Sequence, residues 1–405
     1  MTEKNKLDYG WRLQGEKKLI SLDRSIIFDD SLQDIIDLLT ESSKSYYYIE
    51  RCMQCGICTN SCPQNLINKE FSPRQLIQKL RLGLIDESME EMWLCTSCMA
   101  CELNCPFEVS FLQVQRELRE LIMENGFGYI PKPLKNAVSS IQYYHNPWNF
   151  AQKDRLSPPS ASTESGQFEY ILFLGCFSSF DSHGKKIARA AMSILDKLEI
   201  AYETMGENEV CCGDCAYRTG ASQVFEQMKE LNIKAFKKKK SRHILTICPH
   251  SYDIFSKNYF GEFEDYKVTP LILLLHELFK HGRFNPGENL DFSVTLHDPC
   301  FLARHNDIVA ELRDLIKSVP GVRLVEMEHN GQNSICCGGG GGGVFMDVQK
   351  GKRLTEIRID EAERTGMDIM ITACPICAAM FDDTLKGLDS KLRIQDILEL
   401  IDLSL

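Results

Sequence analysis

Eighteen cysteines constrain this 405-residue chain more than any other feature. All of them belong to a few groups and none is left over, whereas cysteines that only fill a core would scatter. Residues 1–30 are charged throughout and lack the apolar core of a targeting peptide, so we expect a cytoplasmic protein. Because disulfides are rare in the cytosol, cysteines grouped in this way indicate metal binding.

The composition narrows the class of protein further. With 405 residues and 43% apolar residues, the chain is long enough for two or three domains, each with its own core. The longest strongly apolar run, Pro270 to His276, is far shorter than the ~20 residues that span a bilayer. Any membrane attachment is therefore expected through a partner subunit. The net charge of −11 weighs against nucleic-acid binding, which needs a basic surface.

Two of the cysteine groups repeat the pattern Cys-x2-Cys-x2-Cys-x3-Cys-Pro, at residues 52–63 and 95–106. Gaps of two residues let one tight loop place three thiolates on one face of a [4Fe–4S] cube, and in such pairs the fourth cysteine ligates the other cluster. A structural zinc site needs only two Cys-x2-Cys pairs, so the additional cysteines favour iron and sulfur. We expect one cubane cluster on Cys52, Cys55, Cys58 and Cys105, and a second on Cys62, Cys95, Cys98 and Cys101.

Helical patterns surround these two loops. Ser31 begins one candidate helix over residues 31–39, and Ser72-Pro73 with Gln75 begins a second that ends near residue 83. A third runs over residues 111–124, and there is little strand signal. Residues 1–130 are therefore expected to form a helical domain with two [4Fe–4S] clusters of the ferredoxin type. A Pro/Ser-rich stretch at 157–166 marks residues 131–168 as a linker.

The rest of the chain is an internal duplication. In each copy a strand leads to a single cysteine, a helix leads to Cys-Cys-Gly, and a second helix and strand lead to Cys-Pro. The three cysteine anchors are offset by 124, 125 and 126 residues. Short strands alternating with helices predict a parallel α/β domain in each copy, the first repeat at residues 169–285 and the second at 286–405. The expected strands are 170–174, 243–247, 292–296 and 368–372, and the expected helices are 185–198, 222–236, 308–317 and 352–363.

The second repeat holds five cysteines, one more than a cubane cluster needs. Adjacent cysteines fit a distorted cluster with a bridging thiolate better than a regular tetrahedral site. Gly338, Gly339 and Gly340 follow the pair at once, in a run of six glycines. We expect them to bind the cofactor, because backbone without side chains can approach the sulfurs and donate N–H groups, or leave room for a substrate. The candidate ligands are Cys300, Cys336, Cys337, Cys374 and Cys377.

The first repeat also holds five cysteines, but in a different arrangement. Ser251 stands where the second repeat has Cys377, and Cys215 has no counterpart in the second repeat. We expect a further [4Fe–4S] cluster here, and the alternatives are a zinc ion or no metal. The candidate ligands are Cys176, Cys211, Cys212, Cys215 and Cys248.

Four polar side chains recur near these cysteines. His297 precedes the first cysteine of the second repeat and is our candidate catalytic proton donor, and His250, directly after Cys248-Pro249, is the candidate in the first repeat. The alternative for both histidines is a hydrogen bond to a cluster sulfur. Arg218 and Arg304 lie near the cysteines of the two repeats, where they could steady an anionic cluster or bind a substrate carboxylate.

The duplicated Cys…Cys-Cys-Gly…Cys-Pro motif resembles the cysteine-rich CCG domain of heterodisulfide reductase, and the ferredoxin-type run before it resembles that enzyme's small iron–sulfur subunit. Together they resemble the fused catalytic subunit of the membrane-linked enzyme and related iron–sulfur oxidoreductases of anaerobes. In that family a complete five-cysteine motif binds a noncubane [4Fe–4S] cluster that cleaves a disulfide. The resemblance therefore implies such a cluster, with a catalytic role, on the five cysteines of the second repeat. Ser251 departs from the pattern and puts a matched pair of such clusters in doubt.

Two functions follow from the resemblance. In the first, electrons pass through two cubane clusters to the noncubane cluster, which reduces a disulfide or oxidises thiols within an anaerobic energy-conserving complex. In the second, the chain is a relay between a flavoprotein, either a dehydrogenase or electron-transferring flavoprotein, and a quinone-linked or bifurcating partner. No G-x-G-x-x-G follows a strand, so flavin or haem groups are expected on partner subunits of a multisubunit complex.

Overall fold

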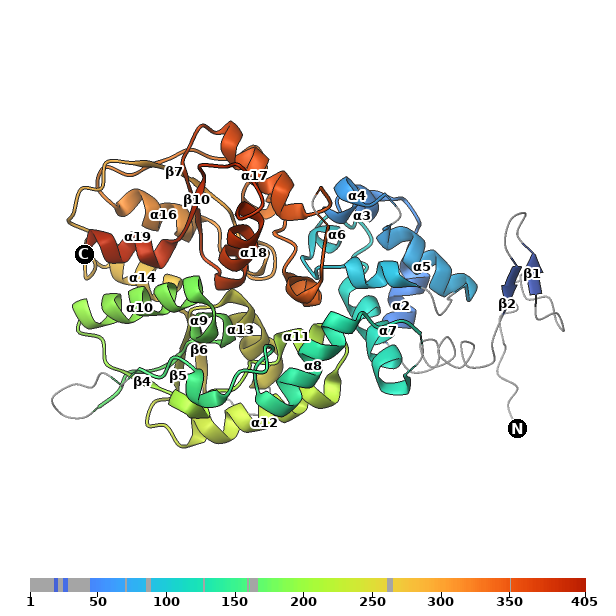
Figure 1. Ribbon diagram of the computed structural model, residues 1–405, viewed down its shortest axis with the longest axis horizontal. Helices are drawn as coiled ribbons and strands as arrows, with labels where there is room; N and C mark the ends of the chain where they lie inside the picture. Colours follow the sequence, from blue (N-terminus) through green and yellow to red (C-terminus); the bar gives the residue numbers. More distant parts are fainter. Residues whose placement is uncertain are drawn as a thin grey trace.

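The computed structural model describes residues 18–20, 25–27, 44–69, 71–84, 89–126, 128–158, 160, 167–260, 265–349 and 351–405. A helical N-terminal region lies beside two α/β units that stack on each other (Figure 1). Ahead of the helical region, β1 (Lys18–Ile20) pairs antiparallel with β2 (Ser25–Ile27). The helix expected over residues 31–39 lies outside the described residues.

Short helices and turns surround the first two cysteine loops. The Ser72 side chain accepts a 3.2 Å hydrogen bond from the backbone N–H of Gln75 and so begins α5, which ends at Gly83 with a φ of 68°. The expected helix after the second loop is confirmed as α7. The elements are α2 (Lys44–Arg51), α3 (Ile57–Asn60), α4 (Gln64–Ile67), α5 (Pro73–Leu82), η1 (Glu90–Leu94), α6 (Ala100–Leu103) and α7 (Phe111–Asn125).

Residues 131–168 contain a helix where the sequence predicts only a linker. This helix, α8 (Lys132–Tyr144), buries Leu134, Val138 and Ile141, and a 3₁₀ turn, η2 (Gln152–Asp154), follows it. Helix α8 packs on α11, α12 and η6, which belong to both α/β units. The segment therefore contributes to the core at the junction of the three parts of the chain.

Each α/β unit contains a four-stranded parallel sheet, as expected. The order is β4-β3-β5-β6 in the first sheet and β8-β7-β9-β10 in the second, so the equivalent strands occupy equivalent places. This shared topology confirms the duplicated α/β fold. The strands are β3 (Tyr170–Phe173), β4 (Tyr202–Thr204), β5 (His243–Thr246), β6 (Lys267–Pro270), β7 (Ser293–Leu296), β8 (Arg323–Leu324), β9 (Ile369–Thr372) and β10 (Arg393–Asp396).

The helices of the two units occupy matching places as well. In the first unit they are α9 (Cys176–Phe180), α10 (Ser182–Lys197), η3 (Gly206–Asn208), α11 (Asp214–Arg218), α12 (Ser222–Lys237), α13 (Pro249–Ile254), the π-helical turn η4 (Phe255–Tyr259) and α14 (Leu271–Lys280). In the second unit they are α15 (Cys300–Ala303), α16 (Ala310–Ser318), η5 (Gly331–Asn333), η6 (Gly340–Phe345), α17 (Leu354–Arg364), α18 (Pro375–Leu385) and α19 (Ile397–Ser404).

The two units pack reciprocally. Helix α10 of the first unit packs on α19 of the second, and α16, the counterpart of α10, packs on α14, the counterpart of α19. One apolar cluster runs through both units and includes Ile187, Leu275, Leu312 and Ile401. Because this core is shared, the relative position of the two sets of cysteines is fixed by buried packing.

Candidate metal centres

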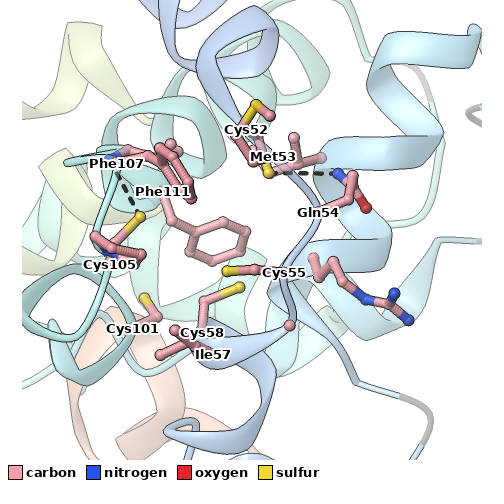
Figure 2. Close-up of a pocket in the computed structure, with 15 residues that line it drawn as sticks. Cys52, Met53, Gln54, Cys55, Ile57, Cys58, Cys101, Cys105, Phe107 and Phe111 are labelled. Atoms are coloured by element: carbon pink, nitrogen blue, oxygen red, sulfur yellow. Dashed lines mark hydrogen bonds between the residues drawn. The ribbon is translucent and has the colours of Figure 1, made fainter.

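One pocket is lined by the first cysteine loop and by residues between Cys101 and Phe111. Figure 2 shows Cys52, Cys55, Cys58 and Cys105 around this hollow, with Cys101 also on its wall. The Cys52 sulfur accepts a 3.4 Å hydrogen bond from the Gln54 side chain, and the Cys105 sulfur accepts one of 3.4 Å from a backbone N–H (Figure 2). The four cysteines expected on one cubane cluster thus come together, and Cys55 is exposed.

The two loops share a backbone conformation. Gln54 and Gly56 have φ values of 57° and 89°, and the equivalent residues of the second loop, Ser97 and Met99, have φ values of 52° and 67°. Left-handed residues at both places turn the chain sharply between cysteines two residues apart. A non-glycine residue in this region is strained, so its occurrence at matching positions indicates a conformation that a ligand set requires.

The second loop gathers the other four cysteines. Burial, and then the neighbouring thiols of Cys98 and Cys95, raise the pKa of Cys62. The thiols of Cys95, Cys98 and Cys62 likewise raise the pKa of Cys101, after burial and Glu102. Thiols that perturb one another in this way lie close together, so Cys62 of the first run belongs with the second loop.

The five cysteines of the second repeat converge at the carboxyl edge of its sheet. Cys300 follows β7 and begins α15, and Cys374 follows β9 and precedes α18. The sulfurs of Cys337 and Cys377 are 3.3 Å apart, and Cys300 and Cys336 pack in one buried cluster. The loop that carries the adjacent pair Cys336-Cys337 completes this group of five cysteines.

The glycine run after this pair has two roles in the structure. The backbone N–H of Gly338 donates a 3.3 Å hydrogen bond to the Cys336 sulfur, and the backbone N–H of Gly339 bonds to Cys337. Gly340 instead lies on the ferredoxin-type region, where an added Cβ would collide with the carbonyl oxygen of Thr96. The run therefore donates to the sulfurs at its start and allows two backbones to meet further on.

The first repeat gathers its cysteines at the equivalent edge of its own sheet. Cys211 and Cys212 are buried in one cluster, against which Cys176 and Cys215 pack. The Ser251 side chain, at the place of the missing cysteine, offsets part of the rise that Cys211 and burial cause in the pKa of Cys212. Cys215 lies on α11 next to Cys212, whose thiol raises its pKa after burial and Asp214. A hydroxyl thus takes the place of one thiol in an otherwise similar arrangement.

The three groups of cysteines touch one another. Thr96 Oγ1 lies 3.6 Å from the Cys336 sulfur, and Cys98 packs with Cys336 and Cys300 in one buried cluster. Cys248 of the first repeat likewise packs with Cys374 of the second in one buried cluster. The sulfur sites therefore form a continuous series from the exposed Cys55 to the junction of the two repeats.

Arg119 holds the centre of this arrangement, although no sequence motif singles it out. It is fully buried, and its guanidinium donates to the carbonyl oxygens of Met92, Cys95, Arg218 and Gly341, at 2.8 to 3.1 Å. Burial lowers its pKa to about 10, although the Cys95 and Cys215 thiols oppose this. Arg119 lies on the same face of its helix as the buried Ile122, three residues further along. An arginine on the apolar face of a helix is the sequence signal that points to such a role.

The candidate polar residues are engaged in fixed contacts. Arg218 pairs with Asp214 at 2.8 Å and with Asp253 at 2.5 Å. Arg304 donates to the Cys98 carbonyl at 2.6 Å and to two carbonyls of the loop before the adjacent cysteine pair. Both arginines thus join separate segments around the cysteines.

The two candidate histidines differ in charge. Burial lowers the pKa of His250, but Asp214, 2.7 Å from its Nδ1, and then Cys374 raise it to about 10. Burial and then Arg358 lower the pKa of His297 to about 3, so this ring is neutral. His250 also stacks on Phe301 of the second repeat, with ring centroids 3.8 Å apart.

The residues present fit iron–sulfur clusters. All eighteen cysteines are free thiols, and most are buried in sets of four or five. Such sets have no use as unligated thiols, because burial leaves weak hydrogen-bond donors without strong partners. Backbone N–H groups aimed at sulfur are the contacts that stabilise cluster thiolates.

No helix among the described residues is both long enough and apolar enough to cross a bilayer.

Comparison with known proteins agrees with this assignment. The 4Fe-4S dicluster domain matches residues 48–109, and the cysteine-rich CCG domain matches residues 170–252 and 294–382. The fold and these domains define an iron–sulfur oxidoreductase. In this chain a 4Fe-4S dicluster domain precedes two CCG domains, and its relatives include a heterodisulfide reductase subunit.

Three relatives show the range of proteins that this chain resembles. The chain is 29% identical to the probable iron-sulfur-binding oxidoreductase FadF of Bacillus subtilis, over 86% of this chain and 59% of that protein. It is 25% identical to the EtfAB:quinone oxidoreductase of Syntrophomonas wolfei, over 87% and 58%. It is 26% identical to one of the subunits of the dihydromethanophenazine:CoB–CoM heterodisulfide reductase of Methanosarcina barkeri, over 87% and 93%. The chain thus spans about three-fifths of the first two relatives.

Proposed function

We propose that this chain passes electrons from a partner protein through two cubane [4Fe–4S] clusters to the second repeat, where a disulfide is reduced or thiols are oxidised. The ligand sets are those expected from the sequence, including Cys62 and Cys105 exchanged between the two loops. The observation that carries the proposal is the contact of Cys98 and Thr96 with Cys336. When bound, the clusters would supply one-electron transfer, and the noncubane cluster would offer iron to a substrate sulfur.

The balance of the reaction defines what the partner must supply. Breaking one S–S bond consumes two electrons and two protons and yields two thiols. The electrons come one at a time from a flavin- or haem-containing subunit, because no dinucleotide-binding motif is present in the sequence. The chain contributes the fixed order of sites, and its exposed Cys55 marks the end at which the partner docks.

A second function is supported by a different observation. Every cysteine of the second repeat is at most 5% exposed. Buried sulfurs in the second repeat suit transfer between proteins as well as chemistry on a substrate, and one relative is named an EtfAB:quinone oxidoreductase. In this case the chain relays electrons between a flavoprotein and a quinone-linked or bifurcating partner, and it is attached to a membrane only through that partner.

Turnover distinguishes the two functions. The full chain, purified without oxygen and loaded with iron, is reduced with viologen and offered a panel of small disulfides that includes the mixed coenzyme M–coenzyme B disulfide. We expect viologen oxidation, and a new paramagnetic signal when thiol is added to the oxidised protein, both lost in Cys377→Ser. This variant places a serine at the position that Ser251 occupies in the first repeat. The control is wild-type protein with full iron content. Loaded protein with neither turnover nor signal would leave the relay as the function.

A further inference from the structure

The two repeats differ in a residue that faces the cysteines. His297 follows β7, and the residue equivalent to it by the spacing to the next cysteine is Phe173, at the end of β3. Phe173 packs on Phe236 and Phe255, with ring centroids 6.2 and 4.8 Å apart. The second repeat therefore has a ring with two polar atoms where the first has an apolar ring.

Arg358 fixes which nitrogen of His297 carries the proton. The Arg358 Nε–H group lies 3.2 Å from His297 Nδ1, and a guanidinium can only donate. His297 Nδ1 therefore accepts, and the single proton of the neutral ring lies on Nε2. Arg358 is itself buried and held by Glu361 at 2.6 Å and by the carbonyl oxygen of His329 at 2.7 Å. The tautomer is thus set by a rigid support.

The Nε2 atom has no partner within the described structure. It is buried, and no protein group lies within hydrogen-bonding distance of it. A ring nitrogen of His297 and the sulfurs of Cys337 and Cys377 all lie within 4.8 Å of one another. The ring packs edge to face on Phe381, with centroids 4.8 Å apart, so its plane is fixed. A buried N–H without a protein acceptor, on a ring that lies beside two cysteine sulfurs, indicates an acceptor in the cluster.

We propose that His297 donates its Nε2–H to a sulfur of the second-repeat cluster, that Arg358 is the positioning residue for this bond, and that the bond raises the reduction potential of that cluster. This inference rests on the cluster proposed for the second repeat. A hydrogen bond to sulfur stabilises the more negative, reduced state of an iron–sulfur cluster. Phe173 offers no such bond in the first repeat.

The test is a redox titration of the full, iron-loaded chain followed by electron paramagnetic resonance. His297→Phe copies the first repeat, and we expect about a tenfold lower ratio of reduced to oxidised second-repeat cluster at fixed potential, equivalent to ~59 mV for one electron. Arg358→Met, which leaves the ring in place, should shift the ratio in the same direction. The double variant should shift no further than His297→Phe, since Arg358 acts through His297. His281→Ala, at an exposed surface position, is the control.

Isotope labelling provides a second readout. Protein containing ¹⁵N-histidine should show one weak nitrogen coupling to the second-repeat cluster, absent in His297→Phe and restored in part as an amide coupling by His297→Gln with labelled glutamine. A strong coupling, as from an Fe–N bond, would overturn the proposal. Iron-loaded variants with an unchanged ratio would overturn this inference alone. Wild-type protein without iron in the second repeat would overturn the proposed function as well.

Discussion

The guanidinium of Arg119 donates a 3.1 Å hydrogen bond to the carbonyl oxygen of Gly341, which lies 222 positions further along the chain. The same side chain donates to the carbonyl oxygens of Met92 and Cys95, at the start of the second cysteine loop, and to that of Arg218, at the end of α11. One buried cation thus ties the ferredoxin-type region to both repeats.

Arg119→Met should destabilise the protein by about 3 kcal/mol or more, because it leaves several buried carbonyl groups without a donor. We expect a lower midpoint of thermal unfolding for the iron-loaded protein, measured anaerobically. Arg116→Met, on the same helix, is the matched control. Arg116 forms a partly exposed pair with Glu120, so its loss should cost within about 1 kcal/mol. Equal effects of the two substitutions would contradict the role given to Arg119.

Gly340→Ala should slow the reduction of the second repeat, because an added Cβ would collide with the Thr96 carbonyl and separate the two sets of cysteines. Rapid-freeze paramagnetic resonance after mixing with a reduced donor measures this rate. Gly287→Ala is the control, since nothing lies within 4 Å of its added Cβ. An unchanged rate with full iron content would show that electrons do not cross at this contact.

Cys62→Ala should damage the cluster of the second loop rather than that of its own loop. The reason is that the Cys62 thiol lies with Cys95 and Cys98. Magnetic resonance and iron analysis of this variant, compared with Cys105→Ala, should show complementary losses. Loss of the first-loop cluster in Cys62→Ala would reject the exchange of the fourth ligands.

Ser251→Cys should give the first repeat the five-cysteine motif of the second repeat, in addition to Cys215, because the Ser251 side chain already lies beside Cys212. If wild-type protein binds about 12 irons, corresponding to three [4Fe–4S] clusters, the variant should approach about 16. If wild-type protein already holds about 16 irons, Ser251→Cys should alter the spectrum of the first-repeat cluster at constant iron content. Cys377→Ser makes the opposite change in the second repeat.

Raising the pH should weaken the contact between the repeats. Burial alone lowers the pKa of His183, but Asp382 and Glu399 of the second repeat, 2.5 and 2.8 Å from its ring nitrogens, raise it to about 10. The histidine of the unfolded chain has a pKa of about 6.5, so this stabilisation is complete below about pH 6.5 and is lost as the pH rises toward 10.

Thermal unfolding of the loaded protein between pH 7 and 9 tests this sign, and His183→Gln should show a flatter dependence. Burial raises the pKa of nearby Asp396 to about 8 and the charge of His183 opposes this rise, so the difference between the two proteins reports His183 together with its effect on Asp396. Parallel curves would mean that the His183 contact does not titrate.

The sequence predicts the elements whose residues repeat or alternate strongly. Strands β3, β5, β7 and β9 and helices α5, α7, α10 and α12 lie within a few residues of their expected positions, because each combines an apolar pattern with a cap or a cysteine anchor. Strands β4 and β8 are short, and β6 and β10 are partly exposed, so their patterns are weak. Helix α8 falls in the segment predicted to be a linker, because the proline-rich stretch that follows it dominates the local pattern.

The sequence also predicts which cysteines act together, because spacing determines how thiolates share a cluster. It does not predict the contacts between sets. Arg119 and Arg358 act through carbonyl and imidazole acceptors that are distant in sequence, and no local pattern reports such partners. The sequence predicts that Gly340 binds the cofactor. It does not predict the contact of Gly340 with Thr96, because Thr96 lies on another domain.

The reciprocal packing of α10 on α19 and of α16 on α14 is the contact pattern of an isologous dimer. Gene fusion of two such subunits frees each half from the requirement to be identical, while their stoichiometry stays one to one. Ser251 and Phe173 in one half, and Cys377 and His297 in the other, are differences that a homodimer could not maintain. The backbones of the two halves are symmetric, whereas the residues around their sulfurs differ. This difference gives electron transfer through the protein a direction.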